Sequence, residues 1–111
     1  ANEEIELYIE AGAEIDADFC LRAEGDSMTG ARIYDGDIIF IRKQSMVDNG
    51  EIAAVIIDDE ATLKRVNYYP DKNLLILKAE NPKYEDLVYT GEQLDHIIIL
   101  GKAVAFQSDI R

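Results

Sequence analysis

Hydrophobic and polar residues alternate along much of the chain with the period of a β-strand. Near the start, Ile5, Leu7 and Ile9 alternate with Glu and Tyr residues, which predicts a strand with one face in water. Further runs rich in Ile, Val, Phe and Tyr are separated by turn-forming residues, and they predict strands at residues 19–23, 37–43, 51–58, 61–69, 74–78, 87–89 and 97–106. The pattern therefore predicts a mostly β protein.

Short polar connections join several of these predicted strands. Residues 58–60 (Asp-Asp-Glu) and 70–73 (Pro-Asp-Lys-Asn) are typical of tight turns, so two consecutive hairpins are expected. Gly101 lies inside the last apolar run, where it favours a bulge or a sharp bend. Helix is limited to single turns near Met28 and near residues 92–94. We expect several strongly twisted β-sheets with a partly closed barrel.

Length and charge narrow the class of protein. A chain of 111 residues with 48% hydrophobic content supports one core, so residues 1–111 are expected to form a single domain. Acidic residues outnumber basic ones 23 to 11, and the net charge of -12 opposes binding to a phosphate backbone. Apolar stretches such as residues 97–100 are far shorter than the roughly 20 residues of a membrane span. The single cysteine, Cys20, excludes an intramolecular disulfide and fits a cytoplasmic protein.

Candidate nucleophiles are few, because the chain has three serines and one cysteine. Ser27 follows Gly25 and Asp26 directly after a predicted strand, where a sharp turn could present a hydroxyl beside backbone N–H groups. Asp and Ser in such a place also commonly cap a short helical turn, and this segment alone favours capping. Cys20 lies in an apolar run and is expected to be a buried side chain. The only histidine, His96, borders an apolar run and is expected at a strand edge.

A lysine can replace histidine as a base, because burial favours the neutral amine and lowers its pKa from about 10.4 toward roughly 7 or 8. Lys64 lies in the middle of a predicted strand, on the same face as Thr62 and Val66, so its stem could enter the interior. The same pattern also fits an exposed strand lysine, and periodicity alone favours that interpretation. The acidic turn at residues 58–60 lacks the spaced oxygen ligands of a cation site, so neither a metal nor another cofactor is expected.

Five segments resemble a known family when they are taken in order. They are residues 22–28 (Arg-Ala-Glu-Gly-Asp-Ser-Met), 34–39 (Tyr-Asp-Gly-Asp-Ile-Ile), 62–66 (Thr-Leu-Lys-Arg-Val), 79–82 (Ala-Glu-Asn-Pro) and 101–104 (Gly-Lys-Ala-Val). Together they resemble the carboxy-terminal domain of LexA-like repressors, which include prophage repressors of the lambda type and the mutagenesis protein UmuD. The likeness covers residues 19–106, and Ser27 and Lys64 are 37 positions apart, as the family pattern expects.

The resemblance implies a LexA- or signal-peptidase-like fold and a self-cleaving peptidase of the Ser-Lys type. On this basis Ser27 is the nucleophile and Lys64 the general base, with the backbone N–H groups of Ser27 and Met28 as oxyanion donors. The substrate would be a bond in the protein's own upstream linker. The resemblance also implies a homodimer, the RecA filament as a candidate co-protease, and loss of repression when the linked DNA-binding and dimerising domains are separated.

Two departures from the family pattern affect these expectations. No basic helix-turn-helix region is present, so the amino-terminal DNA-binding domain is absent from this sequence and DNA is a partner only through that missing portion. The single Ala-Gly pair, Ala11-Gly12, ends 15 residues before Ser27, closer than the family's scissile bond usually lies. We therefore expect the cleaved bond to lie upstream of Ala1.

Two alternatives remain open from the sequence. One is a catalytically silent dimerisation module that keeps the fold without cleaving, which burial of Lys64 and its distance to Ser27 would distinguish. The other is a relative of signal peptidases, against which the missing membrane anchor argues. For the self-cleaving domain and for the silent module alike, we expect dimerisation through exposed strand edges. The strand at residues 97–106 is the candidate edge.

Overall fold

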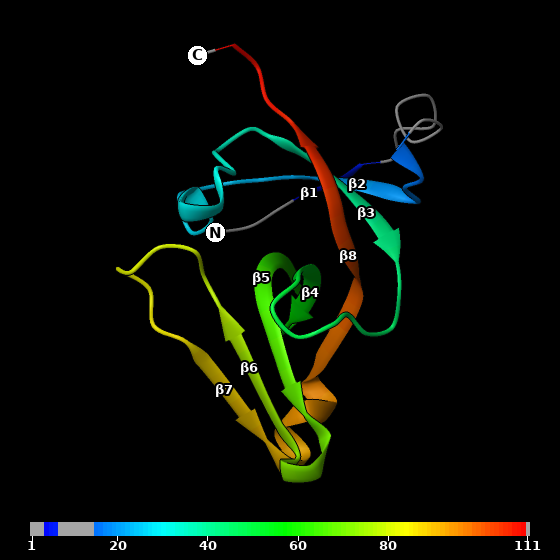
Figure 1. Cartoon of the computed structure of the whole chain (residues 1–111), viewed down its shortest axis with the longest axis vertical. Helices are drawn as coiled ribbons and strands as arrows, with labels where there is room; N and C mark the ends of the chain where they lie inside the picture. Colours follow the sequence, from blue (N-terminus) through cyan, green and yellow to red (C-terminus); the bar gives the residue numbers. More distant parts are fainter. Residues whose placement is uncertain (1–3, 7–14, 111) are drawn as a thin grey trace.

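The computed structural model describes residues 15–110 and, for the backbone alone, residues 4–6 (Figure 1). Strands dominate it, and the helical parts are short 3-10 turns, as expected from the pattern of apolar residues. No helix in this part of the chain is long and apolar enough to cross a bilayer. The elements in chain order are β1 (Glu4–Glu6), β2 (Phe19–Arg22), η1 (Thr29–Ala31), β3 (Ile38–Lys43), β4 (Ile52–Ile57), β5 (Glu60–Tyr69), η2 (Pro70–Lys72), β6 (Leu74–Lys78), β7 (Leu87–Thr90), η3 (Gly91–His96) and β8 (Ile97–Gln107).

The strands form one continuous antiparallel sheet in the order β1-β2-β3-β8-β4-β5-β6-β7. Figure 1 shows β8 running along the molecule, with β2 and β3 beside its carboxy-terminal half and β4 to β7 around its amino-terminal half. The mostly β prediction is confirmed. The separate twisted sheets that we expected are parts of this single sheet, which curls into a half-barrel.

The curl is produced by bulges in β8. Between the partners of Phe40 and Ile41 one extra β8 residue, Val104, is inserted, and a second irregularity inserts Leu100 opposite β4. Bulges increase local twist and bend the strand that carries them. Next to Leu100, a Cβ at Gly101 would stand 2.2 Å from the carbonyl oxygen of Arg42, so only glycine allows β3 to approach this closely. The bulge or bend predicted for Gly101 is found one residue earlier, at Leu100.

The turn between β4 and β5 confirms the first predicted hairpin. Ile57 pairs with Glu60, which leaves Asp58 and Asp59 as a two-residue loop with φ angles of 49° and 69°. Two positive φ angles in a two-residue loop belong to the type I′ turn, whose twist matches that of the strands. The second hairpin, from β5 to β6, turns through η2 and ends with Asn73 in the left-handed region at φ 49°.

The two faces of the sheet bury two separate cores. Because side chains alternate along a strand, Ala54 of β4 and Leu63 of β5 enter the first core, whereas Ala53 and Val66 enter the second. The buried members of the first core are Leu21, Ala23, Met28, Ile33, Ile39, Ile41, Ala54 and Leu63. Those of the second are Val47, Ala53, Val55, Val66, Leu75 and Leu77.

The expectation that β8 is an exposed edge needs correction. β8 lies inside the sheet, and Lys102 has a partner on both sides, Arg42 of β3 and Ala53 of β4. The prediction was wrong because an apolar strand of 11 residues can lie either at the edge of a sheet or, when bent, in its centre. Among the described residues, the side of β8 away from β3 lacks a paired strand only over residues 103–107.

Candidate active site

Ser27 lies in a tight turn that follows β2. Gly25 opens the turn with φ 83°, a conformation that glycine adopts without strain, and Met28 anchors it by packing its side chain into the first core. The Met28 carbonyl accepts hydrogen bonds from the backbone N–H groups of Ala31 and Ile33, at 3.0 and 3.3 Å. Ser27 itself is 6% exposed. The anchored methionine therefore holds the serine at the edge of the core.

The structure does not support the capping interpretation of Ser27. The 3-10 helix η1 begins after Met28, and no side-chain hydrogen bond caps it. Among the described residues, the Ser27 hydroxyl makes no hydrogen bond, and only its backbone carbonyl is bound. A nearly buried hydroxyl without a structural role is unusual, because buried polar groups are normally satisfied. The hydroxyl of Ser27 is thus left available for chemistry.

The loop before β3 forms hydrogen bonds with the residues that lead into the Ser27 turn. The Asp35 carboxylate accepts a hydrogen bond from the Gly25 N–H at 2.8 Å. The carboxylate of Asp37, which is 1% exposed, accepts one from the Tyr34 N–H at 2.8 Å, and the Asp37 carbonyl accepts another from the Ala23 N–H. The motif at residues 34–39 therefore fixes the end of β2 and the glycine that opens the Ser27 turn.

Lys64 lies in the middle of β5, opposite the fully buried Ala53 of β4. It is half-buried, and by strand alternation it shares its face with Val66, a member of the second core. The strand predicted around this lysine is thus confirmed, and by alternation Lys64 lies on the same face of it as Thr62 and Val66.

One short segment borders both the turn of Ser27 and the strand of Lys64. The β5–β6 ladder ends at the pair Arg65 and Lys78, so the chain that continues β6 passes alongside the Lys64 end of β5. Two residues beyond that last pair, the Glu80 N–H donates a hydrogen bond to the Ser27 carbonyl at 2.8 Å. The fold thereby brings the turn of Ser27 and the strand of Lys64 to the same piece of backbone, although they are 37 residues apart in sequence.

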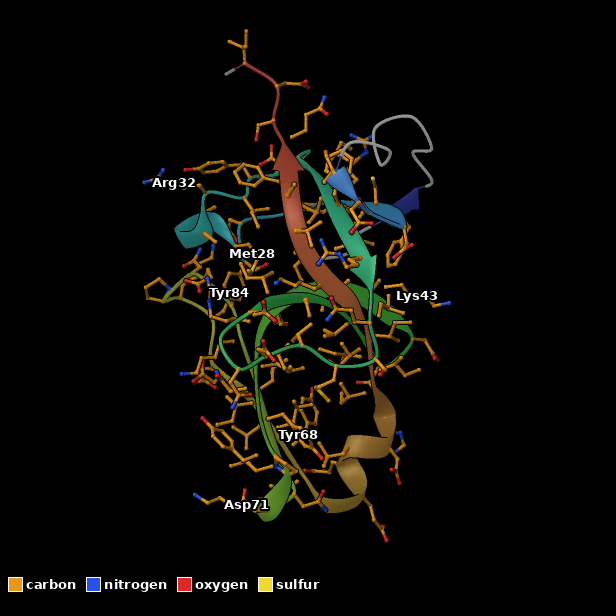
Figure 2. All side chains as sticks on the ribbon, turned by 45° about the vertical axis from the view of Figure 1, so that its right-hand side comes forward. Met28, Arg32, Lys43, Tyr68, Asp71 and Tyr84 are labelled. Carbon is orange, nitrogen blue, oxygen red and sulfur yellow. The ribbon has the colours of Figure 1, made fainter. Side chains whose placement is uncertain are left out.

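A cluster around Asp26 was not identified from the sequence. The Asp26 carboxylate binds the Lys83 ammonium at 2.5 Å and the Tyr84 hydroxyl, and the side-chain amide of Asn81 donates to its carbonyl at 2.8 Å. Lys83 and then Tyr84 hold the pKa of Asp26 below its usual value. Figure 2 shows Met28 and Tyr84 on one side of the molecule, with Tyr68 and Asp71 toward the opposite end. The only sequence signal was the Asn-Pro pair at residues 81–82.

The other chemically interesting residues do not join this site. Cys20 is buried in β2 at 1% exposure, as predicted. His96 ends η3 and is exposed, rather than lying in a strand edge, because η3 extends up to the first residue of β8. The Ala11-Gly12 pair lies outside the described residues.

Comparisons of the sequence with known proteins show which family it belongs to. The sequence profile of the Peptidase S24-like family matches residues 1–104. The chain belongs to the Peptidase S24-like family. The LexA repressor of Desulfitobacterium hafniense is 44% identical over 89 residues, which are 80% of this chain and 40% of that protein. The LexA repressor of Leptospira interrogans is 43% identical over 91 residues, 78% of this chain and 44% of that protein.

A third relative, the LexA repressor of Acetivibrio thermocellus, is 40% identical over 86 residues, 78% of this chain and 38% of that protein. The chain therefore spans about two fifths of the length of these curated relatives. Membership in the Peptidase S24-like family and likeness to part of LexA repressors confirm the resemblance inferred from the five motifs. They make this chain a LexA-like domain of a serine peptidase family.

Proposed function

We propose that this chain is the self-cleaving Ser-Lys peptidase and dimerisation domain of a LexA-like or prophage transcriptional repressor. Ser27 acts as the nucleophile and Lys64 as the general base, and the backbone N–H groups of Ser27 and Met28 bind the oxyanion. The observation that supports the proposal is the Ser27 turn. Its serine is nearly buried, its hydroxyl makes no hydrogen bond among the described residues, and its carbonyl binds the Glu80 backbone, which borders the strand of Lys64.

The chemistry follows from these roles. The neutral Lys64 amine takes the hydroxyl proton while the Ser27 oxygen forms a bond to the carbonyl carbon of the scissile peptide. The resulting oxyanion is stabilised by backbone N–H groups, and the carbon–nitrogen bond then breaks as the Lys64 ammonium gives its proton to the departing amine. Water hydrolyses the remaining ester on Ser27. This step requires the Lys64 amine to lie within hydrogen-bond reach of the Ser27 hydroxyl.

The proposed substrate is a bond in the protein's own upstream linker, and the RecA filament is the candidate activator in the cytoplasm. Cleavage separates the DNA-binding portion from a homodimer, so each half loses the affinity gained from being linked. The open side of β8 at residues 103–107, with Phe106 47% exposed, is the proposed dimer edge. This edge alone would also serve the alternative, a dimerisation module without catalysis.

Self-cleavage of the full-length gene product tests the proposal. The protein is incubated from neutral to alkaline pH, and fragments are followed by electrophoresis and mass spectrometry. We expect cleavage to rise with pH and to stop in Ser27→Ala and Lys64→Ala. Two matched controls, Ser45→Ala in an exposed loop and Lys78→Ala on the neighbouring strand, should keep the parent rate. If the Ser27 or Lys64 variant still cleaves, the assigned roles are wrong. If the parent does not cleave at any pH, the silent module is favoured.

A further inference from the structure

The backbone of Glu80 forms two hydrogen bonds with the Ser27 turn. Its N–H donates to the Ser27 carbonyl at 2.8 Å, and its carbonyl accepts from the Gly30 N–H at 2.7 Å. The contact is close, because a Cβ at Gly30 would stand 2.6 Å from that carbonyl oxygen. Asn81, the next residue, adds a third bond to the carbonyl of Asp26. The backbone of Glu80 is therefore one of the groups that hold the Ser27 turn in place.

Glu80 is bound to β5 through its side chain, and not through the backbone hydrogen bonds of the β5–β6 ladder. The β5–β6 pairing ends at Arg65 and Lys78, two residues before Glu80. Beyond that point the Arg65 guanidinium binds the Glu80 carboxylate and the carbonyl of Gly50. The two side chains are only 34% and 28% exposed, so water screens this pair less than a surface pair. Arg65 directly follows Lys64 in β5.

We propose that the Arg65–Glu80 ion pair is a positioning device that sets the distance between the Ser27 hydroxyl and the Lys64 amine. Three bonded links connect the two groups: Lys64 to Arg65 along β5, Arg65 to Glu80 through the ion pair, and Glu80 to Ser27 through its backbone. Arg65 and Glu80 take no part in bond making. The proposal rests on the self-cleavage described above, and it assigns to the pair the alignment on which that reaction depends.

Arginine suits this role better than lysine. Its planar guanidinium donates through separate nitrogens, and here Nε binds Glu80 while Nη1 binds Gly50. One side chain thus ties the Glu80 segment and the loop before β4 to the same point of β5. A lysine would keep the charge but could not hold both acceptors in a fixed geometry.

The test measures self-cleavage of the full-length gene product in variants of the pair, at temperatures where circular dichroism shows each variant folded. Arg65→Gln and the isosteric Glu80→Gln should each slow cleavage by about 10- to 100-fold, the effect of a misplacement of roughly 1 Å. Arg65→Lys should recover only part of the rate. The double charge reversal Arg65→Glu with Glu80→Arg should cleave faster than either single reversal. The pH dependence of the residual rate should keep its parent shape.

The matched control is Lys102→Gln. It breaks the Lys102–Glu51 ion pair, whose side chains are 34% and 24% exposed. Among the described residues, neither Lys102 nor Glu51 forms a hydrogen bond with the Ser27 turn. This control should cleave at the parent rate. If Lys102→Gln and Arg65→Gln lose the same rate in proportion to their loss of thermal stability, or if Arg65→Gln and Glu80→Gln cleave normally, the positioning role is refuted. Failure of the Ser-Lys reaction itself would show separately, as cleavage that persists in Ser27→Ala.

Discussion

Substitution of Gly30 by alanine is the sharpest steric perturbation of the Ser27 turn. The new methyl group would lie 2.6 Å from the Glu80 carbonyl oxygen and 3.3 Å from the carbonyl carbon. Side-chain carbons do not approach backbone oxygens that closely, so the turn and the Glu80 segment must separate by several tenths of an ångström. The hydrogen bond from the Gly30 N–H to the same carbonyl lengthens with them.

The substitution is expected to lower both the stability of the protein and the rate of self-cleavage, by different amounts. Overpacking in a well-packed site costs about 1–3 kcal/mol of unfolding free energy, which lowers the melting temperature of a domain of this size by roughly 5–20 °C. Misplacement of a reacting group by a fraction of an ångström to 1 Å costs up to about 100-fold in rate. Self-cleavage of Gly30→Ala should therefore fall by about 10-fold or more even where the protein is fully folded.

Gly91→Ala provides the control. Gly91 has φ 58° and no atom within 4 Å of an added Cβ, so alanine there costs backbone strain of about 1 kcal/mol without displacing the site. Melting temperatures are measured by circular dichroism and cleavage rates by electrophoresis. The reasoning is refuted if Gly30→Ala cleaves at the parent rate, or if both variants lose rate only in proportion to their loss of stability.

Three further predictions concern the fold and its titration. In Gly101→Ala, a Cβ 2.2 Å from the backbone oxygen of β3 should lower the unfolding free energy by about 3 kcal/mol, and an unchanged midpoint in urea would contradict this. Because Lys83 and Tyr84 lower the pKa of Asp26, the stability from this carboxylate is present above about pH 4 and is lost as the pH falls through the lower native pKa. The difference in melting temperature between the parent and Asp26→Asn should therefore shrink in acid, and an equal difference at neutral and strongly acidic pH would exclude the effect. Burial raises the pKa of Tyr89, so its stabilising contribution is complete below about pH 10 and is lost as the pH rises through the native pKa. Tyr89→Phe should resist alkaline unfolding better than the parent, and identical alkaline transitions would refute this.

Local patterns predicted the strands well because each is specified by its own residues. Apolar runs bounded by turn-forming residues located seven of the strands within a few residues, and Asp58 and Asp59 defined a turn whose geometry needs two positive φ angles. Gly101 marked a bulge for a local reason as well. These features depend on neighbours within a few positions, which a sequence shows directly.

The arrangement of the strands could not be predicted in the same way. Nothing in the residues of β8 indicates that it lies between β3 and β4, since that order is decided by how two cores close around a bent strand. The sequence suggested an edge, but β8 is paired with β3 over residues 101–107 and with β4 over residues 97–102. Pairing between distant segments is set by the whole fold rather than by a local pattern.

The candidate site also has features that the sequence predicted and contacts that it did not. Ser27 and Lys64 were identified by the resemblance of their motifs. Arg65 and Glu80 lie in two of the same motifs, but their contact with each other was not identified. Glu80, Arg65 and Lys83 look like ordinary surface charges in the sequence, and only the folded chain shows that Glu80 grips the Ser27 turn while Lys83 binds Asp26. Supporting contacts across 15 to 58 residues leave no periodic signal.

An alkyl fluorophosphonate modifies activated serines, so labelling of this chain tests whether Lys64 activates Ser27. The test does not require the upstream substrate. Intact-mass spectrometry follows the rate of adduct formation with rising pH, and peptide mapping locates the adduct. We expect a single adduct on Ser27 that forms faster as the Lys64 amine loses its proton, is absent in Ser27→Ala, and forms far more slowly in Lys64→Ala. An adduct on another residue, or a rate unchanged by Lys64→Ala, would contradict the assignment of these two residues as nucleophile and base.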